Sequence, residues 1–204
     1  APNSVWMLQA QGEANESEKN YDAAIVAFNH VLELEPQRPG IHYRLGRIYR
    51  ARFKDQQKPD DGAAAAREFS AELSIDPDNG NARYELAVMA QEQGNTDEAR
   101  AQYEKVLDRF PDFEEALVGL GGILLDAQKA QQAVAPLERA TRINPDDEVA
   151  WYRLSQAEHA VGNRAEQQRA LAAFQRLHRI TPGTLRRPDQ ELTPQKLGAD
   201  AATN

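Results

Sequence analysis

The chain has 204 residues, of which 41% are apolar and 27% are charged, and its net charge is −8 at neutral pH. This composition is typical of a folded protein, and the acidic balance argues against a nucleic-acid partner. No apolar run is long enough to cross a bilayer, so no segment is expected to insert into a membrane. The absence of cysteine excludes disulfides and thiolate metal sites.

Five helix-forming apolar runs along the chain stop at a proline. The stops are Pro36, Pro77, Pro111, Pro145 and Pro182. The two middle intervals are 34 residues long, whereas the first is 41 and the last is 37. The sequence therefore predicts five copies of one unit, with seven extra residues in unit two and three extra residues in unit five.

Residues at fixed distances from the prolines show where these insertions lie. A small residue stands ten positions after each of the first four prolines, and an alanine stands twelve positions before every proline. Both insertions must fall between those positions, in the turns near residues 53–62 and 161–168. We expect these turns to be longer than those of units three and four. Deleting residues 54–60 is expected to cost little, because surface turns tolerate changes in length.

Each unit is predicted to form two antiparallel helices. In the second half of unit one, Ala24, Phe28 and Val31 recur at helical spacing, and the following proline ends the helix. Gly94 and Gly162 mark turns between the two halves of their units. A small residue in the first helix is placed to receive the large side chain that stands sixteen or seventeen positions later.

This pattern resembles the tetratricopeptide repeat. In unit two the resemblance is carried by Leu45-Gly46, Tyr49, Ala65, Phe69 and Pro77, and in unit five by Trp151, Leu154, Gly162, Ala170, Phe174 and Pro182. It implies an all-α, right-handed α-solenoid of about five antiparallel helical hairpins. The expected single domain covers residues 4–182, as units 4–38, 39–79, 80–113, 114–147 and 148–182. A tail that contains proline and glycine follows at residues 183–204.

A few positions depart from the repeat pattern. Gln11 stands where other units have leucine, Glu72 occupies a position that is usually small or apolar, and Ser155 replaces glycine. None of these is expected to prevent the fold. Gly119 and Gly122 lie in one predicted helix, where glycine costs about 1 kcal/mol relative to alanine, and they are expected to open a notch.

In the family, the first helices of the units line a concave groove that holds peptides or partner proteins. Residues seven, eleven and fourteen positions after each proline share that helical face: Tyr43, Arg47, Arg50, Tyr84, Val88, Gln91, Val118, Gly122, Leu125, Tyr152, Gln156 and His159. As a binding site, this face is an aromatic ladder with a basic patch, suited to an extended peptide with apolar and acidic groups. The alternative is that the tyrosines only wedge neighbouring units apart.

An enzymatic activity is not expected. The histidines stand in different units without a second ligand at helical spacing, so neither a metal nor a cofactor is predicted: they are His30, His42, His159 and His178. No serine stands in a nucleophile elbow. Paired carboxylates such as Asp60-Asp61 lie at turns, where helix capping explains them. The predicted function is therefore a scaffold for protein–protein interaction.

The ends of the array provide an alternative function. Repeat arrays expose an apolar face at each end unless a polar helix covers it. Residues 1–36 carry a net charge of −5, and residues 164–187 carry +5. Copies of the chain could then stack head to tail into an oligomer or filament. The residues expected at such a contact are Trp6, Met7, Phe174, Leu177, Leu185, Leu192 and Leu197.

Three expectations about the termini stay open at this point. The charge separation also fits chance or an excised fragment. The start at Ala1, without methionine or a recognisable tag, favours an exported protein over a cytoplasmic fragment. The tail is expected to dock on its own last unit or on the next molecule.

Overall fold

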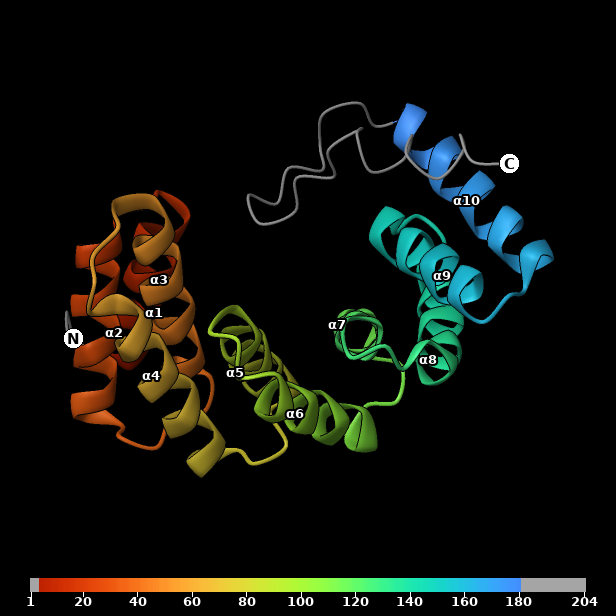
Figure 1. Cartoon of the computed structure of the whole chain (residues 1–204). Helices are drawn as coiled ribbons and strands as arrows, with labels where there is room; N and C mark the ends of the chain where they lie inside the picture. Colours follow the sequence, from red (N-terminus) through yellow and green to blue (C-terminus); the bar gives the residue numbers. More distant parts are fainter. Residues whose placement is uncertain (1–3, 181–204) are drawn as a thin grey trace.

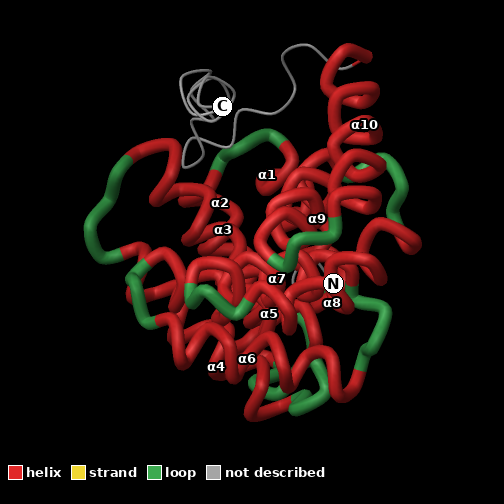
Figure 2. Tube along the Cα trace, turned by 45° about the vertical axis from the view of Figure 1, so that its right-hand side comes forward, coloured by secondary structure: helices red, strands yellow, loops and turns green. Residues whose placement is uncertain are grey.

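The structure is a computed structural model, and it describes residues 4–180 of the chain. Its regular secondary structure in this range is entirely α-helical, and short turns join the helices (Figure 2). The helices are α1 (Val5–Ser17), α2 (Tyr21–Leu34), α3 (Ile41–Gln56), α4 (Asp61–Ile75), α5 (Gly80–Glu92), α6 (Thr96–Arg109), α7 (Glu114–Asp126), α8 (Ala130–Ile143), α9 (Glu148–Ala160) and α10 (Arg164–Ile180). The predicted all-α solenoid is confirmed.

Consecutive helices pair into five hairpins that stack along a curved array (Figure 1). The turn inside each hairpin contains one residue with a positive φ. Gly94 (77°) and Gly162 (81°) take this conformation in units three and five, where the sequence predicted turns. Lys19, Gln57 and Gln128 take it in the other units, so a side chain is tolerated there. The helices α2, α4, α6 and α8 each end two residues before a proline.

The core lies between the two helices of each hairpin and continues into the next hairpin. A Cβ atom added to Gly12 would lie 2.7 Å from the Phe28 ring, and one added to Gly121 would lie 2.5 Å from Leu137. Both large side chains are fully buried. The expectation that small residues of the first helix receive large residues of the second is therefore confirmed.

The inserted residues lengthen helices more than turns. In unit two, α3 has 16 residues against 13 in α5 and α7, and the turn that follows it is residues 57–60. In unit five, α10 has 17 residues against 14 in α8. The turn 161–163 is as short as the turns 93–95 and 127–129. The prediction of a longer turn in unit five is therefore wrong, because the extra residues form an additional helical turn at the start of α10.

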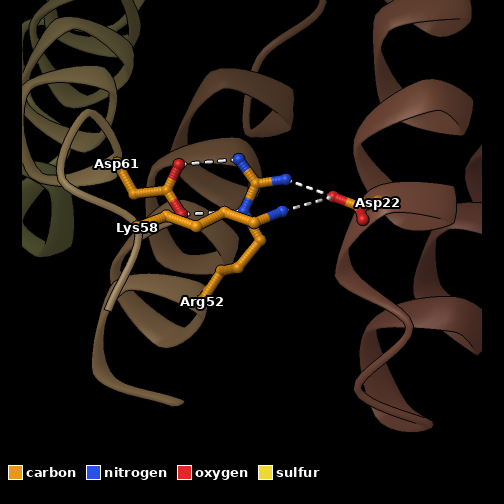
Figure 3. A network of polar contacts seen from close by, with 4 residues as sticks. All are labelled: Asp22, Arg52, Lys58 and Asp61. Atoms are coloured by element: carbon orange, nitrogen blue, oxygen red, sulfur yellow. Dashed lines mark hydrogen bonds and ion pairs between the residues drawn. The ribbon is translucent and has the colours of Figure 1, made fainter. Parts of the chain in front are cut away.

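Arg52, near the end of the lengthened α3, binds carboxylates of both neighbouring helices (Figure 3). Its guanidinium donates to both oxygens of Asp61 on α4, over 2.7 and 2.6 Å, and also to Asp22 on α2. The Lys58 ammonium lies 3.4 Å from the same Asp22 carboxylate. The hydrogen bond from Arg52 holds the pKa of Asp22 below its ordinary value.

A second contact joins the end of α3 to the start of α2. The Tyr21 hydroxyl donates to Asp55 over 2.6 Å, and the Lys19 ammonium lies 3.2 Å from the same carboxylate oxygen. The hydrogen bond to Asp55, together with burial, raises the pKa of Tyr21 to about 12. The extra length of α3 thus gives units one and two additional contacts.

Candidate partner-binding site

The predicted groove residues all lie on the first helices of their hairpins. Figure 1 shows α5, α7 and α9 along the inner side of the curve, with α6, α8 and α10 outside them. Side chains spaced by three or four positions on α3, α5, α7 and α9 therefore share one face. We call this surface the inner face.

The tyrosines of the inner face pack against aromatic residues of their own hairpins. The ring centroids of Tyr43 and Phe69 are 6.0 Å apart, and those of Tyr152 and Phe174 are 5.3 Å apart. Tyr84 lies 5.9 Å from Tyr103 and also stacks on Phe113, at 5.4 Å. Burial of the Tyr43 ring raises its pKa. The tyrosines thus have a packing role, while their half-buried rings leave part of each surface available.

The arginines expected to form a basic patch are already paired. Arg50 donates to Glu85 and, over 2.7 Å, to Glu92, and its side chain is only 13% exposed. The Arg47 guanidinium lies 3.7 Å from Glu16. In addition, Arg44 contacts Glu16 at 3.2 Å and Glu13 at 2.9 Å. Glutamates on α1 and α5 thus offset the positive charge of these arginines, and the basic patch as a binding site stays a prediction.

The predicted groove positions on α5, α7 and α9 hold no carboxylate, lysine or arginine. Val88 and Leu125 are partly exposed, Gln156 and His159 are exposed, and Val118 is buried. Aliphatic and aromatic surface of this kind can pack against apolar side chains of another molecule.

The notch expected at the glycines of α7 is filled. A Cβ atom on Gly119 would lie 2.5 Å from the Tyr103 ring, and one on Gly122 would lie 2.7 Å from the Arg153 guanidinium. Arg153 also donates a hydrogen bond to the backbone oxygen of Val118 over 2.7 Å. These glycines therefore allow side chains from α6 and α9 to approach the backbone of α7.

The residues proposed for end-to-end contact differ in exposure. Trp6 is 74% exposed and Met7 is 56% exposed, whereas Phe174 and Leu177 are each 8% exposed. The Arg38 guanidinium lies 5.3 Å from the centre of the Trp6 ring. The three leucines proposed in the tail, Leu185, Leu192 and Leu197, lie outside the described residues, and so does the docking predicted for that tail.

Within residues 4–180, no group of three or more histidine, aspartate and glutamate side chains is placed to hold a metal ion. His42 lies 2.7 Å from Glu68, and His178 lies 3.3 Å from Glu148. Each of these two histidines thus has one carboxylate partner. No helix in this range has the length and apolar character needed to span a membrane.

The sequence reasoning missed the acidic residues of the inner face. Glu115 and Asp126 lie three positions before and eight positions after Val118, which places them on its face of α7. Both side chains are exposed. Their positions, four and fifteen residues after Pro111, are a signal in the sequence that places them on this helical face.

The fold and the inner face define a helical-repeat protein of the protein-binding class. Models of the tetratricopeptide repeat match residues 7–38, 56–117 and 90–158. The chain therefore belongs to the tetratricopeptide repeat family.

Curated relatives match about three quarters of this chain, but the chain spans less than a fifth of their length. The human protein O-mannosyl-transferase TMTC3 is 23% identical over 163 residues, which are 75% of this chain and 18% of that protein. The cellulose synthase operon protein C of Xanthomonas axonopodis pv. citri is 29% identical over 164 residues, which are 74% of this chain and 10% of that protein. The transferase name belongs to the much longer human protein.

Solved structures share the fold at low sequence identity. MamA superposes with a TM-score of 0.68 at 16% identity, over 86% of this chain and 92% of its own. PilF of Pseudomonas aeruginosa superposes with a TM-score of 0.69 at 18% identity, over 85% of this chain and 76% of its own. YrrB, described as a TPR protein with an unusual peptide-binding site, gives 0.66 at 16% identity, over 89% of each chain. These likenesses establish the solenoid fold.

Proposed function

We propose that the chain is a non-catalytic scaffold that binds a partner protein or an extended peptide on the inner face of α5, α7 and α9. The observation that carries this proposal is the row of partly exposed, uncharged side chains on these consecutive helices: Tyr84, Val88, Leu125 and Tyr152. Aromatic and aliphatic side chains that are held rigid by packing are typical anchors for a bound peptide.

We expect the first two units to contribute less of the binding energy than the other units. Arg50 and Arg47 already bind glutamates, so a partner carboxylate would have to displace an existing ion pair. Tyr43 and Tyr84 keep half-buried rings next to this region. We therefore expect most of the binding energy from the uncharged part of the face.

Selection of peptides on the immobilised chain tests the proposal. Twelve-residue random peptides recovered from a display library should bind the unchanged protein. The double variant Val88→Arg/Leu125→Arg places two charges on the uncharged surface and should weaken that binding by about tenfold or more. Circular dichroism and thermal unfolding would establish that the variant is folded.

A matched control distinguishes the inner face from general effects of added charge. Val26 is 55% exposed and Leu34 is 53% exposed, and both lie on α2. The double variant Val26→Arg/Leu34→Arg should bind the recovered peptides as the unchanged protein does. Equal binding by both double variants would remove the support for the inner face as the binding site.

Self-association is the second candidate function. It is favoured by the exposure of Trp6 and Met7 on α1, because a large exposed apolar side chain at the end of a repeat array is a potential contact for another molecule. The opposite charges of residues 1–36 and 164–187 are compatible with a head-to-tail arrangement.

A further inference from the structure

The charges of the inner helices show what kind of segment would suit the proposed site. Together α5, α7 and α9 contain seven carboxylate side chains and only two arginines. Glu148 and Glu158 are buried, and Glu85 and Glu92 pair with Arg50, so only part of this acidic excess reaches the surface around Val88 and Leu125.

The arginines near this surface are committed to partners within the chain. Arg50 of α3 binds Glu85 and Glu92, which uses the acidic side chains of α5 on that side. Arg153 of α9 donates to the backbone oxygen of Val118. A partner carboxylate would thus meet cations that are already engaged.

Two carboxylates of the same surface form no ion pair within the described residues. Glu115 and Asp126 are exposed, and neither forms an ion pair with any other described residue. They are eleven positions apart on α7, which corresponds to about 16 Å along the helix axis. Leu125 lies between them in the sequence and is partly exposed, whereas Val118 is buried. An acidic group therefore stands near each end of α7.

Building on the function proposed above, we propose that the bound segment has an apolar centre flanked by lysine or arginine. The apolar side chains would lie on the strip formed by the partly exposed Val88 and Leu125, and the cations would approach Glu115 or Asp126. Opposite charges at the rim of an interface increase the association rate and exclude wrongly charged partners. This partner has the opposite charge to the acidic peptide expected from the sequence.

The recovered twelve-residue peptides provide the first readout. They should be richer in lysine and arginine than the unselected library, with these residues on either side of an apolar stretch. Replacing the flanking cations of the tightest peptide by glutamate should weaken its binding to the full chain by about tenfold in 0.05 M salt. The difference should shrink in 0.5 M salt, where exposed charges are screened more strongly.

Charge reversal in the protein provides the second readout. The double variant Glu115→Lys/Asp126→Lys should reverse the order and prefer the glutamate-flanked peptide. Asp97 and Asp108 of α6 offer a matched control, since they are also eleven positions apart and stand near the start and end of their helix. Both are exposed without an ion pair among the described residues. The variant Asp97→Lys/Asp108→Lys should keep the original order.

The possible results separate this inference from the proposed function. Peptides that require Val88 and Leu125 but show no excess of basic residues would overturn the inference and leave the binding site standing. If no recovered peptide depends on Val88 and Leu125, both ideas fail. A dimer that is lost in Val88→Arg/Leu125→Arg would identify a second copy as the occupant and would also overturn the inference.

Discussion

Glu72 departs from the repeat pattern and caps a helix. Its carboxylate is fully buried in α4 and accepts hydrogen bonds from the backbone N–H groups of Gly40 (2.7 Å) and Tyr43 (3.1 Å) at the start of α3. The Asn79 side chain donates a third, over 3.2 Å. The first N–H groups of a helix have no partner within it, so this glutamate satisfies two of them from another helix.

Replacing Glu72 by the residue that other units carry should therefore destabilise the protein. Val31 and Val106 occupy the equivalent position, five residues before the proline, in units one and three. We expect Glu72→Val to lower the free energy of unfolding by about 2–3 kcal/mol, because it leaves buried donors without an acceptor. Glu72→Gln keeps one acceptor oxygen and should cost less. Urea unfolding of both variants would measure this, and a more stable Glu72→Val protein would contradict the capping role.

The role of a single residue could be predicted from the sequence only where it depends on the position of that residue within the repeat. The sixteen-residue spacing of Gly12 and Phe28 predicted that they meet, and they do. The ion pairs of Arg50 were not predictable, because Glu85 and Glu92 lie 35 and 42 residues away in the chain. Repeat spacing shows which face a side chain occupies, but not which long side chain of the next unit reaches it.

At the scale of the helices, insertions are absorbed where the local sequence favours helix. The segment before Gln57 consists of residues that continue α3, and its last turn is held by Tyr21 through Asp55. In unit five, Arg164, Ala165 and Glu166 are good helix formers and extend α10. The register located both insertions correctly between the expected positions. It did not show that they would be helical.

The contacts of α3 change the expected effect of shortening it. Deleting residues 54–60 would remove Asp55 and Lys58, so the buried Tyr21 hydroxyl would lose its acceptor. We now expect this deletion to cost about 2 kcal/mol of stability, measured by urea unfolding, in place of the small effect expected for a surface turn.

A deletion in unit five serves as the control for that experiment. Residues 164–166 form the additional turn of α10, and Glu166 makes an exposed ion pair with Arg169. Exposed pairs contribute little, so deleting these three residues should change stability by less than about 1 kcal/mol. Equal losses from the two deletions would mean that the contacts of Asp55 and Lys58 are unimportant.

At the scale of the whole molecule, the array has two differently built halves. Ion pairs connect α1 to α3 and α3 to α5. Between α7 and α9, the Arg153 side chain packs against Gly122, where the absence of a Cβ atom lets it come close to the helix. Charged side chains of the first half are thus used within the chain, whereas the second half offers apolar surface and unpaired carboxylates. A partner should therefore bind the second half of the array in preference to the first half.

The end of α1 leads to a prediction about assembly. If Trp6 and Met7 contact another copy, light scattering should show a mass that increases with protein concentration in 0.1 M salt. The variant Trp6→Lys/Met7→Lys should remain a monomer, because two charges replace the exposed apolar side chains and weaken the contact. Phe53 (40% exposed) and Ile143 (39% exposed) lie elsewhere on the array, so Phe53→Lys/Ile143→Lys should assemble as the unchanged protein does.

Salt distinguishes the head-to-tail arrangement from an apolar contact alone. Attraction between the −5 and +5 segments should weaken as the screening length falls from about 10 Å at 0.1 M to about 3 Å at 1 M salt. Assembly that depends on Trp6 but strengthens with salt would retain the apolar contact and exclude the charge-driven arrangement. A monomer at every concentration and salt would reject self-association, and the inner face would then be the remaining candidate for the working surface.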